Sequence, residues 1–81
     1  MNSKTLSAIR ENTWARVTQI QPGPIAPRLV EMGFCEGSEV RVLYKAPFNG
    51  PVAVELGASV VALRLSEAEM VWVVDEKREG A

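Results

Sequence analysis

The chain has 81 residues, of which 47% are hydrophobic and 23% charged, and its formal net charge is −1. This length allows one domain, and the near-average composition excludes a disordered or fibrous chain. Nine lysines and arginines against ten acids leave no positive excess to neutralise phosphates, so we expect no nucleic acid partner.

Targeting features predict a cytosolic protein. No apolar run approaches the roughly 20 residues that cross a bilayer, so we expect no direct insertion into the membrane. Residues 1–12 lack the apolar stretch and the cleavage site of a signal peptide. Cys35 is the single cysteine and cannot form an internal disulfide, which fits a reducing compartment.

The start of the chain predicts a helical turn and then a strand. Leu6 and Ile9 are three residues apart, a spacing that fixes one turn of helix onto a core. Residues 14–20 are β-branched and aromatic, as in a strand, and they end at a Pro-Gly-Pro turn.

A short helix follows, with a glycine turn behind it. Residues 25–32 repeat apolar side chains at spacings of four and three, as on one face of an amphipathic helix. We expect Gly33 to end this helix at positive φ and Gly37 to turn the chain into the next strand. Such a turn is also expected to hold Phe34 at the surface.

The second half of the chain predicts four strands, 39–46, 52–56, 60–65 and 70–74. Asn49-Gly50, with a proline on each side, predicts a tight turn after the first of them, and Gly57 predicts the turn after the second. Ser66 and Glu69 have the spacing of a capping box and predict one helical turn before the last strand.

These elements predict a mainly β fold. Five short strands with Gly and Pro turns and one short helix are typical of a small closed barrel. We expect this domain to cover residues 4–75. Residues 76–81 form a charged tail that buries too little apolar surface to stay ordered.

Residues for catalysis or metal binding are missing from the pattern. The chain has no histidine, no phosphate loop and no nucleophile motif, so we expect no enzyme. The acids are scattered, which predicts no metal site and no cofactor. Cys35 is interpreted as a small, partly buried apolar residue in preference to a redox or metal-binding group.

Four residues are candidates for contact with a partner protein: Phe34, Phe48, Asn49 and Trp72. Phe48 and Asn49 lie between two prolines at a loop tip, where Phe48 serves either loop packing or partner contact. If Val71 and Val73 point inward, Trp72 points outward. It then either packs under the N-terminal turn or is an exposed anchor of the kind that dominates interfaces.

Several motifs resemble those of the FeoA family, the small cytosolic accessory proteins of bacterial ferrous iron uptake. They are Arg28-Leu29, Met32-Gly33, Glu36-Gly37, the stretch from Ala46 to Pro51, and Ala62-Leu63-Arg64 with Glu67-Ala68. The start of the chain, "TLSAIRENTWARV", is also similar to the family's start.

The resemblance implies a five-stranded Src-homology-3-like barrel with one short amphipathic helix and additional helical turns. Gly33, Gly37, Gly50 and Gly57 are interpreted as structural turn residues from turn chemistry alone. The resemblance also implies a partner, the cytosolic G-domain region of the membrane transporter FeoB, which would bring a cytoplasmic protein to the inner membrane.

Two other hypotheses stay open. A related domain ends some metal-dependent transcriptional repressors, so the chain is alternatively a transcription-linked domain, although no helix-turn-helix precedes its barrel. An adaptor for proline-rich peptides is a third class, but its groove needs several exposed aromatic residues and the chain has five in all.

Overall fold

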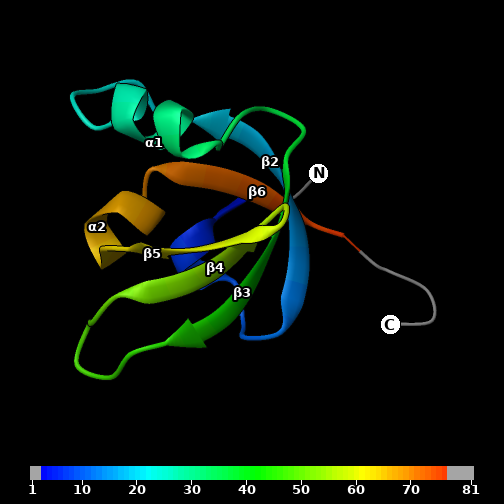
Figure 1. Ribbon diagram of the computed structural model, residues 1–81, viewed down its shortest axis with the longest axis vertical. Coiled ribbons are helices and arrows are strands. Elements are labelled where there is room, and N and C mark those ends of the chain that lie inside the picture. The colour runs from blue at the N-terminus through cyan, green and yellow to red at the C-terminus, as the bar shows by residue number, and fades with distance from the viewer. Residues whose placement is uncertain (1–2, 77–81) are drawn as a thin grey trace.

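The computed structural model describes residues 3–76, and in this range six strands form one antiparallel sheet (Figure 1). Their order across the sheet is β1-β6-β2-β3-β4-β5. The strands are β1 (Lys4–Thr5), β2 (Thr13–Ile20), β3 (Glu39–Lys45), β4 (Val52–Leu56), β5 (Ser59–Leu63) and β6 (Val71–Asp75). The mainly β class is confirmed, and the two-residue β1 is one strand more than the sequence predicts.

Hydrogen bonds do not close the sheet into a barrel. Within residues 3–76, the end strand β1 pairs with β6 alone, and the other end strand, β5, pairs with β4 alone. After Leu63 the chain enters helix α2 (Leu65–Ala68), which packs against β5 and against the 3-10 helix η1 (Leu6–Ala8). The prediction of a closed barrel is wrong because helical segments, in place of a backbone ladder, join the two ends of the sheet.

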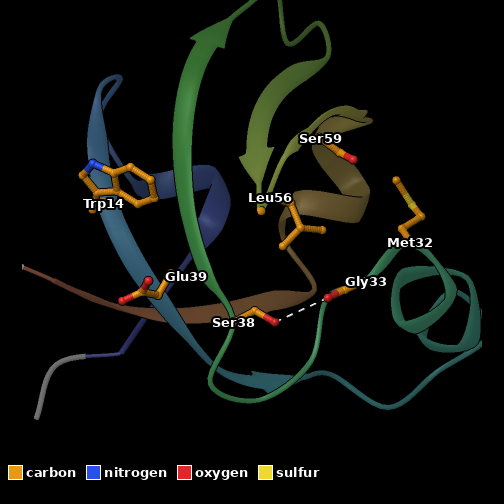
Figure 2. Close-up of a pocket in the computed structure, with 8 residues that line it drawn as sticks. Trp14, Met32, Gly33, Ser38, Glu39, Leu56 and Ser59 are labelled. Carbon is orange, nitrogen blue, oxygen red and sulfur yellow. Dashed lines mark hydrogen bonds between the residues drawn. The ribbon is translucent and has the colours of Figure 1, made fainter.

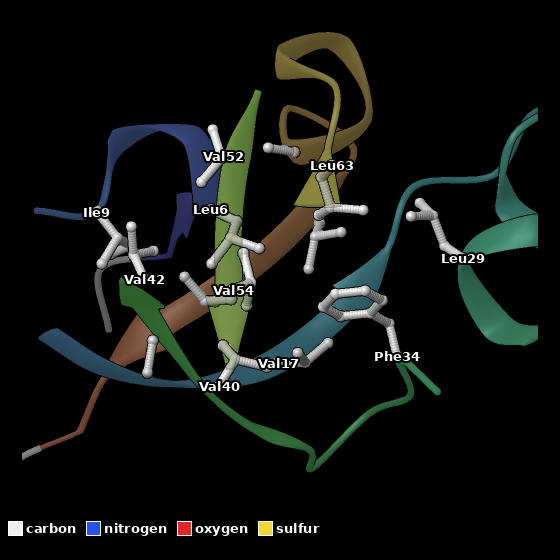
Figure 3. Packing of buried hydrophobic residues seen from close by; sticks show 14 residues of the cluster. Leu6, Ile9, Val17, Leu29, Phe34, Val40, Val42, Val52, Val54 and Leu63 are labelled. Atoms are coloured by element: carbon white, nitrogen blue, oxygen red, sulfur yellow. The ribbon is translucent and has the colours of Figure 1, made fainter. Parts of the chain in front are cut away.

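Strand alternation builds the core. Val40 and Val42 of β3 are fully buried and face Leu56 and Val54 of β4 in register. Val52 and Val54 of β4 and Val71 and Val73 of β6 turn inward in the same way, as expected where one face of a sheet is solvated. In β2 the alternation holds for Ala15 and Val17 and ends at the register shift before Gln19. The buried cluster, drawn in Figure 3, consists of Leu6, Ile9, Ala15, Val17, Leu29, Phe34, Val40, Val42, Val52, Val54, Leu63, Ala68, Val71 and Val73.

Helix α1 (Ala26–Met32) confirms the predicted amphipathic helix. Its apolar face packs on the core through the buried Leu29, with Ile25 and Met32 partly buried beside it. A proline lies in the first turn, where the missing N–H leaves no helical bond unmade. In Figure 1 the helix lies at one end of the sheet, close to the end of β2.

The start of α2 differs from the predicted capping box. The N-cap is Arg64, and its backbone N–H donates to Oε1 of Glu67 at 2.8 Å. The arginine side chain has no acceptor to return a bond, so only half of a capping box forms. The prediction of Ser66 and Glu69 is therefore two residues late, because the helix begins immediately after β5.

The expected tail, residues 76–81, lies outside the described residues except for Glu76. The backbone N–H of Glu76 donates to the carbonyl of Trp14 at 3.0 Å, and its carboxylate lies 2.9 Å from the Arg16 guanidinium. Glu76 is thus bound to β2 in the same manner as the residues of β6 before it.

Candidate partner-binding surface

The turn after α1 is a Schellman motif. Gly33 has φ +111°, and its N–H donates to the Val30 carbonyl at 3.0 Å while the Phe34 N–H donates to the Leu29 carbonyl at 3.1 Å. This motif turns the residue after the glycine back toward the helix. Phe34 is accordingly fully buried in the core (Figure 3), so its prediction as a surface residue for a partner is wrong.

The remainder of this turn has the opposite exposure from that expected. Because Phe34 faces the core, Cys35 faces solvent, and the prediction of a partly buried cysteine is wrong. Its backbone N–H donates to Oγ of Ser38 at 3.2 Å. Gly37 has φ +92° and donates its N–H to the Val17 carbonyl at 2.8 Å, which ties the turn to β2.

Phe48 and Asn49 form the tip of the turn between β3 and β4. The Gly50 N–H donates to the Pro47 carbonyl at 3.2 Å, and φ is +60° at Phe48 and +59° at Asn49. Two central residues at positive φ match the turn that suits the twist of a hairpin. The turn is therefore centred one residue earlier than Asn49-Gly50.

Gly50 is a turn residue for a steric reason. A Cβ atom there would lie 2.7 Å from Cβ of Ala46 and 3.1 Å from the Pro47 carbonyl oxygen. Gly57 has φ +61° in the two-residue turn between β4 and β5, as predicted from its position. Gly50 thus allows the chain to pass close to Ala46 and Pro47 in the β3–β4 hairpin. Gly57 allows a left-handed conformation in the β4–β5 hairpin.

Phe48 combines strain with exposure. A bulky residue at positive φ is a conformational outlier, and the described residues include no large hydrophobic side chain as exposed as its 98%. The hairpin turn imposes this positive φ, while the ring itself stands outside the core. Residues held in such sparsely populated conformations cluster at functional positions.

Two hollows adjoin this tip. Their volumes are about 350 and 380 Å³, and both are lined by Asn49, Gly50 and Leu65. Glu69 borders the first and Arg64 the second. An exposed aromatic ring beside concave, mixed-charge surface is the arrangement found at protein interfaces. We call Phe48, Asn49 and Leu65 the tip surface.

Another hollow lies elsewhere, between the end of α1 and the β4–β5 turn. It measures about 600 Å³, and Figure 2 shows the lining residues Trp14, Met32, Gly33, Ser38, Glu39, Leu56 and Ser59. The dashed bond in the figure is donated by Ser38 Oγ to the Gly33 carbonyl at 3.4 Å. Among residues 3–76, Glu39 is the one charged residue that lines this hollow.

Trp72 lies away from the tip surface. Val71 and Val73 are fully buried, so alternation turns Trp72 outward as predicted. It is half-buried, stands opposite Thr5 of β1, and its Nε1 donates to Oε1 of Gln21 at 3.0 Å. The strand registers place it toward the opposite end of the sheet from Phe48, so the two aromatic candidates do not share one surface.

One connection between distant segments is absent from the sequence interpretation. Nε of Arg28, in α1, lies 3.5 Å from Oε2 of Glu67, in α2, and the Glu67 side chain is only 5% exposed. The two residues belong to separate FeoA-like motifs. Their opposite charges are the signal in the sequence that is consistent with the contact.

Two absences hold for the part of the chain that the structure describes. Within residues 3–76 no three His, Cys, Asp or Glu side chains are close enough together to hold a metal ion. No helix in the same range is long and apolar enough to span a membrane.

One known protein family matches almost the whole described chain. A family model described as the FeoA domain matches residues 4–75. The chain belongs to the FeoA family. This membership supports an accessory role in iron transport. A comparison with curated proteins found no match.

Solved structures of FeoA proteins share the fold. FeoA from Stenotrophomonas maltophilia, in complex with zinc, is 40% identical over 89% of this chain and 88% of that one, with a TM-score of 0.74. It is described as a prokaryotic SH3 domain protein, which agrees with the predicted architecture. FeoA from Chlorobium tepidum is 29% identical over 94% of this chain and 74% of that one, with a TM-score of 0.81.

The fold also occurs inside transcriptional repressors. A manganese-dependent repressor is 25% identical over 91% of this FeoA-family chain, with a TM-score of 0.84. The match covers 42% of the repressor, so the similarity is to one part of a larger protein.

Proposed function

We propose that this chain is a non-enzymatic cytosolic module of bacterial ferrous iron uptake that binds the cytosolic region of FeoB through the tip surface. The observation that carries the proposal is Phe48, which is 98% exposed and held at positive φ. Membership of the FeoA family supports a role in ferrous iron uptake, and the tip surface is the proposed site of contact with FeoB.

The physical argument starts from the cost of this conformation. Holding an L residue in the left-handed region costs about 1–2 kcal/mol, and an exposed ring recovers none of it within the chain. Interfaces are dominated by a few aromatic anchors that enter pockets on the partner. Phe48 therefore behaves as a preformed anchor, with Asn49 beside it and Leu65 between the two adjoining hollows.

The direct test measures binding of the FeoB cytosolic region from the same organism. Phe48→Ala should weaken the association by about 1–3 kcal/mol, a loss of roughly 5- to 150-fold. Its thermal midpoint and circular dichroism should stay close to wild type, because the ring buries almost no surface. Tyr44→Ala is the matched control, since Tyr44 is an aromatic residue of β3 with 55% exposure.

The proposal requires a difference between these variants. Equal binding by Phe48→Ala and wild type, together with full restoration of ferrous iron uptake in a strain lacking the protein, would remove Phe48 as the anchor. Attention would then move to Trp72 and the outer face of β6. No binding of FeoB by the wild-type protein would contradict the function itself.

The alternative function is that of a domain that modulates a metal-dependent repressor, and the similarity to the manganese-dependent repressor favours it. Deletion of the gene separates the two. Loss of ferrous iron uptake with unchanged transcription supports the transport role, whereas altered expression of metal-regulated genes under constant metal supply supports the repressor role.

A further inference from the structure

Strand β5 is an exposed edge of the sheet. It pairs with β4 along one side, and its other side has no strand partner in residues 3–76. Four of its five residues are not buried, and Val60 is 63% exposed. An uncovered edge of this kind is a template for pairing with another chain.

The register with β4 identifies which backbone groups face outward. Leu56 and Ser59 flank a two-residue turn, and their backbone groups therefore exchange hydrogen bonds. Along β4 and β5 away from this turn, hydrogen-bonded residue pairs alternate with pairs that are not hydrogen-bonded. Val60 and Ala62 fall in the unbonded pairs. Their N–H and C=O groups point away from β4 and make no hydrogen bond to any described residue.

The edge also lacks the features that usually block such pairing. Natural edge strands carry lysine, proline, a bulge or an inward-pointing charge. Here residues 56–63 contain neither a charged residue nor a proline, and the β4–β5 register is continuous. The first charged residue is Arg64, immediately after the strand.

We propose that β5 pairs antiparallel with β5 of a second copy of this chain, about a twofold axis at Val61. Val60 of each copy then faces Ala62 of the other copy. These two hydrogen-bonded residue pairs use all four outward N–H and C=O groups of each strand. The strand is complementary to itself because its outward groups are spaced symmetrically about Val61.

Charge also favours a second copy as the occupant. Ser59–Leu63 contains no charged residue, so pairing two copies along β5 brings no like charges together. Arg64 lies just beyond the strand, at the N-cap of α2. In an antiparallel pair the two arginines therefore stand at opposite ends of the interface.

The size of the contact predicts its strength. Pairing of two five-residue strands buries less than the roughly 1,200 Å² of a standard stable interface. The dimer should therefore be weak and in rapid exchange. This pairing uses a different element from the tip surface and does not depend on the proposed binding of FeoB.

Sedimentation equilibrium of the purified chain at concentrations up to about 1 mM tests the pairing. The average mass should rise toward that of a dimer with concentration. Val60→Lys should weaken the association by roughly tenfold or more, because a lysine on an edge strand opposes pairing. Val30→Lys is the matched control, as Val30 is a 55% exposed valine on α1.

Amide hydrogen exchange identifies the interface directly. The amides of Val60 and Ala62 should become more protected as concentration rises, whereas the Val61 amide, bonded to β4, should not change. A monomer mass at every concentration overturns the proposal. A dimer that Val30→Lys weakens equally, or one that leaves the Val60 and Ala62 amides unprotected, uses another surface and also overturns it.

Discussion

Replacing Phe48 with glycine should stabilise the fold while weakening the proposed binding. An L residue at φ +60° costs about 1–2 kcal/mol, and glycine removes this cost but adds about 0.5–1 kcal/mol of backbone entropy. The lost burial is negligible because the side chain is 98% exposed. The expected net gain is about 0.5–1 kcal/mol, or roughly 2–8 °C in thermal midpoint for a chain of this length.

Chemical and thermal denaturation of wild type, Phe48→Gly and Phe48→Ala measure this effect. Alanine removes the ring but keeps a Cβ at positive φ, so it should stay within about 0.5 kcal/mol of wild type. The difference between glycine and alanine thus isolates the backbone strain from the ring. Both variants should bind the FeoB cytosolic region more weakly, which would make the glycine variant more stable and less functional.

The reasoning fails if the glycine variant is no more stable than the alanine variant. The turn would then adopt an ordinary φ at Phe48 in solution, and strain would give no reason to assign the residue a function. A loss of stability in both variants would show that the ring packs against the protein.

Further predictions concern the turns, the α2 cap and ligand binding. Gly33→Val should cost about 1–3 kcal/mol in denaturation, because φ is +111° and a Cβ would lie 3.2 Å from a neighbouring leucine, whereas Cys35→Ser should change stability by less than about 0.5 kcal/mol. Gly50→Ala should cost about 1–3 kcal/mol, since its new Cβ would meet another Cβ at 2.7 Å. Glu67→Ala should cost about 1–2 kcal/mol by removing the acceptor at the start of α2, while Glu69→Ala, at an exposed position, should be near neutral. Calorimetry should detect no stoichiometric micromolar binding of ferrous iron or guanine nucleotide, since the sequence has neither a histidine nor a phosphate loop.

Opposite results would have specific meanings. Equal effects at Gly33 and Cys35 would mean that the helix does not end in a left-handed residue. A larger effect at Glu69 than at Glu67 would restore the capping box expected from the sequence. Stoichiometric iron binding would require a ligand set outside the described residues or between two copies.

Elements that depend on local chemistry are predictable from the amino-acid sequence alone. Alternating Val40 and Val42 predict a strand with one buried face, because successive side chains point to opposite sides. Gly33 predicts the end of α1, since glycine enters the left-handed region without a Cβ clash. The outward direction of Trp72 follows from the same alternation, and the exposure of Phe48 follows from its place between two prolines.

Packing between distant segments sets where neighbouring residues of one turn point and which distant residues meet. Phe34 and Cys35 exchange their expected environments because the Schellman turn directs Phe34 onto the core and leaves Cys35 facing solvent. The Arg28–Glu67 contact depends on how α1 and α2 pack, and the edge of β5 stays open because α2 diverts the chain before the sheet closes. Local rules do not contain such choices, because each depends on packing between segments that are far apart in the chain.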